Sequence, residues 1–341
     1  MKELFEYRRE MDKLEPSQTR KDALVEMMLK EQPAPMGHSR HRKAGRTALA
    51  AACLAGVLVV GASATGLLKT AAQAFAGVFG EAPAVTQVVD KIGRPVGVSD
   101  TDNGITITAD AIIGEKDGVA VIYTISRDDG SPFDLTADEN GHLNVAFQEF
   151  EQGVLFDQGL SGSCWFLDAV PGDNEIQLFT NYRAFGAHGT LKQGVVNTQF
   201  KDFYSYDPET QEEYPIADGE WKLNYELKFV DCSTTLHSGE QFTLQNGTEI
   251  TVDEIVVSPL GVHASYSSSS FDIDDFDRLL PVVTLTDGTV LNPECMSHSS
   301  DVSNDDDMAP YPCSSSLIFN RLIPLEQIQS ITVDGIMIPM H

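Results

Sequence analysis

Cysteine, aromatic and basic residues are all scarce in this chain. Its 341 residues include five cysteines and two tryptophans, and 8% are aromatic. No pair of cysteines has the CxxC spacing of thioredoxin-type redox motifs and zinc knuckles, so neither is supported. The sequence also lacks the GxSxG, HExxH, Walker and GxGxxG motifs. We therefore predict that the chain is not an enzyme and binds no cofactor and no metal.

The few basic residues are concentrated near the N-terminus. Lys and Arg number 23 against 51 Asp and Glu, a net charge of -28. Residues 1–46 contain 11 basic and 8 acidic residues, so the whole negative excess follows residue 46. Nucleic acid and anionic lipid both need neutralising Lys and Arg, so we expect no nucleic-acid partner. The asymmetry indicates two compartments or two kinds of partner, although solubility alone would also explain the acidity.

Two acidic clusters, at 272–277 and 301–307, contain candidate calcium ligands. Carboxylates at alternate positions can gather around Ca²⁺, which takes six to eight oxygens. Neither cluster has the glycine and the distal glutamate of an EF-hand loop. We expect both to be solvated loops.

An uncharged run at 47–68 predicts a transmembrane helix. Its 22 residues would reach about 33 Å as a helix, enough to cross the hydrocarbon core. By the positive-inside rule, the basic cluster before it keeps the N-terminus in the cytoplasm and the C-terminal part outside. The orienting residues are Arg40, Arg42, Lys43 and Arg46. A signal peptide cleaved near Ala74 and a buried soluble helix are the alternative interpretations.

The tail at 1–46 has apolar residues at helical spacing. A first stripe, spaced 3, 4 and 3, consists of Leu4, Tyr7, Met11 and Leu14. Pro16 ends this helix, and Ser17 is a suitable N-cap for a second one. The second helix carries Leu24, Met27 and Met28 on a common side. Helices this short do not fold alone in water, so the tail either binds a partner or stays weakly ordered.

The acidic remainder contains an internal repeat at an offset of 143 residues. The segment 103–123 (NGITITADAIIGEKDGVAVIY) aligns without gaps with 246–266 (NGTEITVDEIVVSPLGVHASY). The nine matches are Asn103/Asn246, Gly104/Gly247, Ile107/Ile250, Thr108/Thr251, Asp110/Asp253, Ile112/Ile255, Gly118/Gly261, Val119/Val262 and Tyr123/Tyr266. Each copy has a β-branched run, a turn and a second run, which predicts a hairpin. The repeat indicates two related β domains in tandem.

We therefore predict a mainly β chain with two tandem immunoglobulin-like sandwiches, preceded by short helices and one transmembrane helix. A juxtamembrane linker at 69–83 precedes the first sandwich, at 84–214. Within it, 69–80 is expected to be a helix on the membrane surface, with Phe75, Val78 and Phe79 facing lipid. The second sandwich, at 218–341, would begin with the alternating run WKLNYELKFV, and further strands are expected at 281–285, 316–320 and 328–333.

Four cysteines follow the predicted membrane span, and three pairings are possible if that region is extracellular. We favour a disulfide between Cys295 and Cys313, because it would close an acidic loop. Four free thiols are the alternative.

Three stretches resemble a known family. They are FEYRREMDKLEPSQTRKDALVEMM, GRPVGVSDTDNGITITADAIIGEKDGVAVIYTI and DGEWKLNYELKFV. The layout is similar to single-pass proteins of Gram-positive bacteria that have an anti-sigma-like cytoplasmic tail. Their ectodomain begins with the domain of unknown function numbered 4179, and the third stretch resembles the start of its companion domain.

This resemblance implies that the tail binds an extracytoplasmic-function sigma factor and that the ectodomain senses an envelope signal through an unknown ligand. The implied contact residues are Leu4, Phe5, Tyr7, Met11, Leu14, Leu24, Met27 and Met28. The HxxxCxxC zinc motif of many anti-sigma domains is absent, so such binding would be metal-free. A cell-surface binding or adhesion protein with an inert tail is the alternative function.

Overall fold

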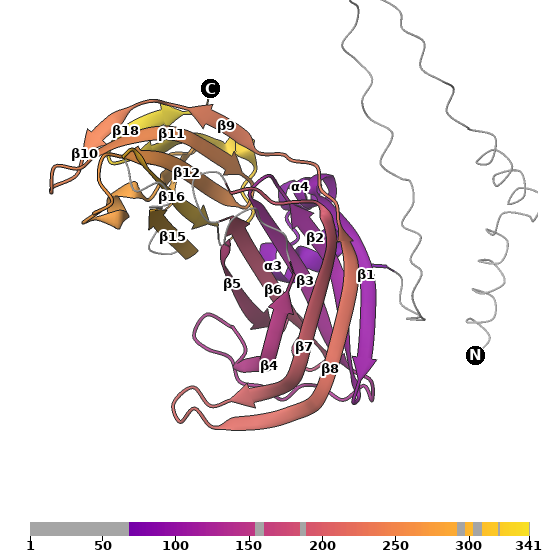
Figure 1. Ribbon diagram of the computed structural model, residues 1–341. Coiled ribbons are helices and arrows are strands. Elements are labelled where there is room, and N and C mark those ends of the chain that lie inside the picture. The colour runs from indigo at the N-terminus through magenta and orange to yellow at the C-terminus, as the bar shows by residue number, and fades with distance from the viewer. Residues whose placement is uncertain are drawn as a thin grey trace, which may run out of the picture. The chain divides into compact units, whose positions relative to one another are not determined.

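The computed structural model describes residues 68–153, 160–184, 189–291, 297–302, 309–319 and 321–340 (Figure 1). These residues form mainly antiparallel β-sheets with two α-helices, α3 (Ala71–Phe79) and α4 (Pro83–Ile92). The prediction of a mainly β chain is confirmed. The tail and all but the last residue of the 47–68 run lie outside this part of the chain, in which no helix has the length and apolarity needed to span a membrane.

The first β unit contains eight strands in two sheets that share one core. The strands are β1 (Gly93–Asp102), β2 (Ile105–Gly114), β3 (Gly118–Arg127), β4 (Val145–Gln152), β5 (Leu160–Leu167), β6 (Glu175–Ala184), β7 (Gly194–Tyr206) and β8 (Glu213–Leu227). Their orders are β1-β2-β3-β6-β5 and β4-β7-β8. The core between the sheets includes Tyr123, Phe200 and Trp221. The indole N–H of Trp221 donates to the carbonyl of Ile105 at 2.9 Å and so joins the two sheets.

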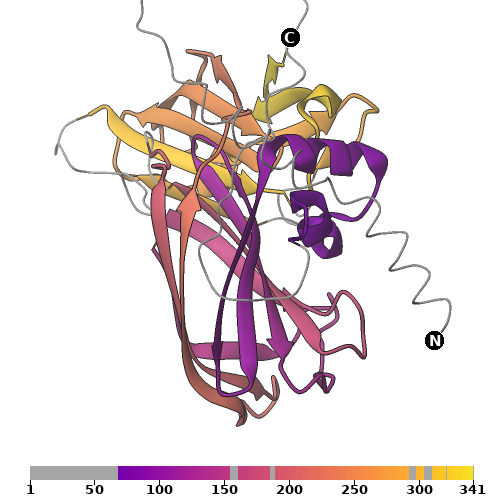
Figure 2. The same cartoon turned by 90° about the vertical axis from the view of Figure 1, so that its right-hand side faces the viewer.

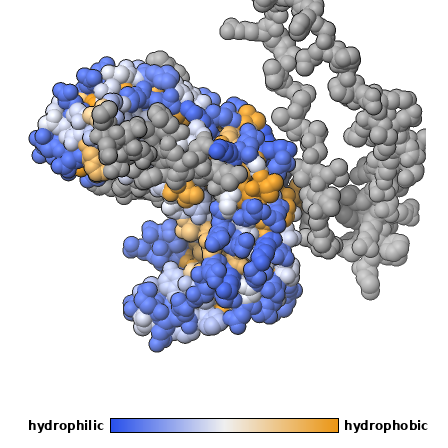
Figure 3. All heavy atoms as spheres, in the orientation of Figure 1, coloured by the Kyte–Doolittle hydropathy of each residue, from blue (hydrophilic) through white to orange (hydrophobic). Residues whose placement is uncertain are grey.

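The larger sheet is covered on its other face by α3 and α4 (Figure 2). Ala111 and Ile113 of β2, with Ala120 and Ile122 of β3, pack in a core shared with these helices. Strands buried on both faces need continuous apolar runs rather than alternation, which explains the composition of β2 and β3. On the face seen in Figure 3, the described residues are mostly hydrophilic, with smaller hydrophobic patches.

Helix α3 confirms the helix expected at 69–80 but not its surroundings. Thr70 and Gln73 form a reciprocal capping box at its start. Phe75 is fully buried and packs edge-on against Phe179, with ring centroids 6.3 Å apart. Val78 and Phe79 are partly buried against the same core. The expectation that these three side chains face lipid is therefore wrong, because they cover a sheet of their own chain.

The second β unit also has two sheets around one core. Its strands are β9 (Thr234–His237), β10 (Gln241–Thr243), β11 (Glu249–Ser258), β12 (Gly261–Ser268), β13 (Val282–Leu285), β14 (Val290–Leu291), β15 (Ser297–Val302), β16 (Tyr311–Ile318), β17 (Ile328–Val333) and β18 (Ile336–Pro339). Short 3-10 helices occupy Phe276–Leu279 and Leu325–Gln327. One sheet has the order β10-β11-β12-β16-β15, with β9 also on β11, and the other β14-β13-β17-β18. The expected later strands correspond to β13, β16 and β17.

The two units repeat one strand order. The order β2-β3-β6-β5 facing β4-β7-β8 recurs as β11-β12-β16-β15 facing β13-β17-β18. Both hairpins also shift register at the matched aspartates, Asp110 and Asp253. Asp110 accepts a hydrogen bond from Thr124, and Asp253 accepts one from Ser267, each 14 residues further along the chain. The sequence repeat is thus confirmed in topology and in register.

The predicted boundary between the units is wrong. The alternating run at 221–230 belongs largely to β8, which pairs along β7 and contributes Trp221 and Leu227 to the first core. A period of two identifies a half-buried strand but not the sheet it joins. Strand β8 runs through the expected break at 214–218, so the second unit begins after Leu227.

Replacing Trp221 by Ala tests this boundary. We expect a loss of about 3–5 kcal/mol in the unfolding free energy, because a large core side chain is removed. Hydrogen exchange should then accelerate at amides of β3 and β7, while β12 and β17 keep their protection. Loss of protection confined to β12 and β17 would place β8 with the second unit instead.

Candidate functional site

The site residues proposed from the sequence lie mostly outside the described residues. This applies to the tail contacts, to the basic cluster 40–46 and to Cys295. Cys313 is buried in the core of the second unit. Because Cys295 is outside the described residues, the pairing of these two cysteines stays a prediction. Cys164 and Cys232 carry free thiols. The described residues contain two other polar clusters, which sequence reasoning did not find.

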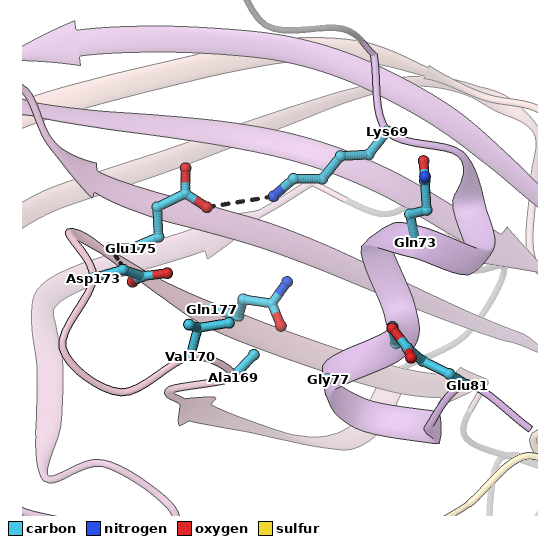
Figure 4. Close-up of a pocket in the computed structure, with 10 residues that line it drawn as sticks. Lys69, Gln73, Gly77, Glu81, Ala169, Val170, Asp173, Glu175 and Gln177 are labelled. Atoms are coloured by element: carbon cyan, nitrogen blue, oxygen red, sulfur yellow. Dashed lines mark hydrogen bonds and ion pairs between the residues drawn. The ribbon is translucent and has the colours of Figure 1, made fainter.

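The first cluster lines a groove of about 400 Å³ between α3, the turn before β6 and β6 itself (Figure 4). We call it the α3 groove. Its polar lining residues are Lys69, Gln73, Glu81, Asp173, Glu175 and Gln177. Three of these are acidic and one is basic, so the groove is electronegative.

Lys69 lies among three acceptors at the start of α3. Its Nζ is 3.1 Å from the Thr124 hydroxyl, 3.4 Å from Asp110 Oδ2 and 3.6 Å from Glu175 Oε2. The Asp110 side chain is 7% exposed and that of Lys69 37%. Burial raises the pKa of Asp110, while Lys69 and Thr124 oppose the rise. Lys69 therefore compensates a buried carboxylate and ties the start of α3 to β2, β3 and β6.

Gln177 forms the floor of the α3 groove and is only partly satisfied. Its Nε2 donates to the carbonyl of Ala74 at 3.2 Å, and the residue is 8% exposed. Its Oε1 has no hydrogen-bond partner among the described residues. A Cβ on Gly77 would lie 2.5 Å from this oxygen, so a glycine there lets α3 approach the sheet closely.

The second cluster surrounds Arg183, which is fully buried near the end of β6. We call it the Arg183 cluster. The Nη1 of Arg183 donates to Asp117 Oδ2 at 3.0 Å. Its Nη2 donates to Glu115 and, at 2.9 Å, to the hydroxyl of Ser258. Glu115 and Asp117 belong to the β2–β3 turn of the first unit. Ser258 ends β11, next to the equivalent turn of the second unit.

These two turns are built alike. In the first, the carbonyl of Lys116 accepts from the backbone N–H of Leu191 at 2.8 Å, and that of Asp117 accepts from Ala184, the last residue of β6, at 2.7 Å. In the second, those of Pro259 and Leu260 accept from Ile323 and Phe319, at 3.0 and 2.9 Å. Leu260 also packs in the core shared with α3 and the first sheet. The duplicated turns therefore meet, and Arg183 lies where they meet.

Burial dominates the electrostatics of the Arg183 cluster. It raises the pKa of Glu115 to about 7; Arg183 opposes this rise and Asp117 adds to it. Burial alone would lower the pKa of Arg183, but Glu115 and Asp117 raise it. The guanidinium thus stays charged while Glu115 exchanges a proton near neutral pH.

One face of β6 links the two clusters. Glu175, Gln177, Phe179 and Arg183 occupy alternate positions and so share a face. Glu175 forms an ion pair with Lys69, and Gln177 donates a hydrogen bond to α3. Phe179 packs under α3, and Arg183 donates a hydrogen bond to Ser258 of the second unit. The acidic lining of the α3 groove can recognise positively charged groups. In the described part of the chain, no group of three His, Cys, Asp or Glu residues could hold a metal ion.

No family model and no curated protein matches the chain. Among solved structures, "The crystal structure of the conserved domain protein from Bacillus anthracis" aligns with 13% identity and a TM-score of 0.45. The alignment covers 70% of this chain and 75% of that one. A likeness this distant assigns no function.

The raised pKa of Glu115 makes stability depend on pH. Between the ordinary value of 4.5 and about 7, the folded state holds a proton that the unfolded state has released. The contribution of this group to stability therefore falls as pH rises through that window, by up to about 3 kcal/mol. Urea unfolding at pH 5 and pH 8 should show a smaller difference for Glu115→Gln than for the wild type. An equal difference in both proteins would exclude this role.

Removing the buried guanidinium should be costly. In Arg183→Met, Glu115 and Asp117 lose their countercharge, and we expect a loss of about 3–5 kcal/mol, measured by urea unfolding. Arg278→Met is the matched control, because Arg278 pairs with Asp334 at a partly exposed site and should cost about 1 kcal/mol. Adding Glu115→Gln and Asp117→Asn to Arg183→Met should restore part of the stability. Equal losses in the two single variants would contradict the assignment.

Proposed function

We propose that this chain is an anti-sigma-like single-pass membrane regulator. The tail at 1–46 binds an extracytoplasmic-function sigma factor, 47–68 crosses the membrane with the N-terminus in the cytoplasm, and the β units sense an envelope signal outside. The amphipathic tail, the basic cluster before an uncharged run and the acidic remainder support this assignment.

One structural observation carries the proposal. The proposed span ends at Leu68, and the next residue, Lys69, is bonded to β2, β3 and β6. Three residues after the span, α3 begins, with Phe75 buried on the sheet. With so short a connection, a rearrangement of the β units at α3 would act directly on the membrane segment. A sensor that signals across a membrane needs such a connection.

We further infer that the β units are tandem immunoglobulin-like sandwiches. Constant-type immunoglobulin domains have strands A-B-E-D in one sheet and C-F-G in the other. Labelling β2 to β8 as A to G gives this order, and β11, β12, β13, β15, β16, β17 and β18 give it again. Strands β1, β9, β10 and β14 are additions at sheet edges. Such domains commonly bind ligands, which supports a sensing role and equally the alternative of a surface-binding or adhesion protein.

Co-purification from membranes with a sigma factor of the same cell tests the regulator. Leu24→Asp places a charge on the proposed apolar face and should reduce recovery of the sigma factor at least tenfold, because a desolvated charge costs more than 1.4 kcal/mol. Lys30→Gln lies outside the proposed contact set and serves as the control. Binding that survives deletion of residues 1–31, or no binding to any sigma factor of the cell, would leave the adhesion protein as the better assignment.

A further inference from the structure

The start of α3 holds an ammonium group that belongs to the chain itself. Lys69 Nζ has the Thr124 hydroxyl, Asp110 and Glu175 around it at 3.1 to 3.6 Å. An ammonium has three N–H donors, and three acceptors are present. Because the Lys69 side chain is 37% exposed, its contact with Glu175 is solvated and weak. A second ammonium could therefore replace Lys69 at Glu175 at little cost.

The rest of the α3 groove offers further acceptors for such a guest. Glu81 and Asp173 line the same groove. Asp173 is fixed by accepting the backbone N–H of Glu175 at 2.8 Å. Gln177 also lines the groove (Figure 4), and its buried Oε1 has no partner among the described residues. A volume of about 400 Å³ is within the range of small-molecule sites.

We propose that the α3 groove binds an organic oligocation through its ammonium groups, in competition with Lys69. One ammonium takes the place of Lys69 Nζ at Glu175, and a second pairs with Glu81 or Asp173. Polyamines and lysine-rich peptides share this chemistry. A divalent metal is disfavoured, because its oxygen ligands must converge to roughly 2.0–2.6 Å and no described cluster of carboxylates does so.

The competition gives the groove a means of signalling. Displacement of Lys69 removes a tie between the start of α3 and the sheet. Under the proposed function, on which this consequence rests, that tie adjoins the membrane segment, and its loss would weaken sigma-factor retention. Binding itself does not depend on the tail.

Isothermal titration calorimetry of the full chain in detergent, with spermine as the titrant, tests binding to the α3 groove. We expect one saturable site. Lys69→Ala removes the internal competitor and should tighten binding about three- to tenfold, whereas Glu175→Gln should weaken it by a similar factor. Asp173→Asn keeps an oxygen for the Glu175 N–H and should also weaken binding. The matched controls, Lys201→Ala and Glu149→Gln, break an exposed ion pair outside the groove and should change affinity less than twofold.

Three results would overturn the proposal. These are the absence of saturable binding, equal tightening by Lys69→Ala and Lys201→Ala, and unchanged affinity in both Glu175→Gln and Asp173→Asn. Saturable Mg²⁺ binding with the same variant pattern would refute the ammonium assignment. Circular dichroism verifies that each variant is folded. If Lys69→Ala does not fold, the affinity of Asp173→Asn for spermine tests the proposal instead. Sigma-factor co-purification with and without spermine is a separate measurement. If no sigma factor is recovered, the proposed regulator is refuted, but the calorimetric result on groove binding is unaffected.

Discussion

The buried guanidinium of Arg183 is the constraint on which the arrangement of the β units depends. An unpaired charge at a fully buried position is costly, so Nη1 and Nη2 of Arg183 need acceptors from the surrounding turns. Two of those acceptors come from the first unit and one from the second. The close approach also requires Gly261, since a Cβ there would lie 2.9 Å from Arg183 Nε. The charge therefore fixes both turns at once.

The duplication explains how such an interface arises from one chain. The two turns have the same backbone hydrogen bonds, but their side chains differ at matched positions. Glu115 corresponds to Ser258, and Asp117 corresponds to Leu260. The first copy supplies the countercharge, and the second supplies a hydroxyl and an apolar contact. Two identical acidic turns would bring four carboxylates to one guanidinium, which like-charge repulsion disfavours. Divergence at these positions lets the copies meet.

Local and periodic features could be predicted from the sequence, whereas features that depend on distant partners could not. The hairpins at 103–123 and 246–266 follow from β-branched runs around turns, and a helix is expected at 69–80, where the structure has α3. The alternation of β8 predicts a strand correctly but not the unit it joins, because alternation is the same whichever sheet a strand belongs to. Arg183 bonds groups 66 to 75 residues away, and no local pattern distinguishes it from a surface arginine.

Lys69 and Arg183 act on one element, strand β6. Strand β6 is buried on both faces, and its odd-numbered residues lie under α3 at one end and against the second unit at the other. Packed side chains have few alternative rotamers, so a shift of α3 over Phe179 cannot be absorbed locally. It must move the helix away from the sheet or move the strand. Where the strand moves, a cation that loosens Lys69 acts on the strand that carries Arg183, so β6 physically connects the α3 groove with the contact between the units.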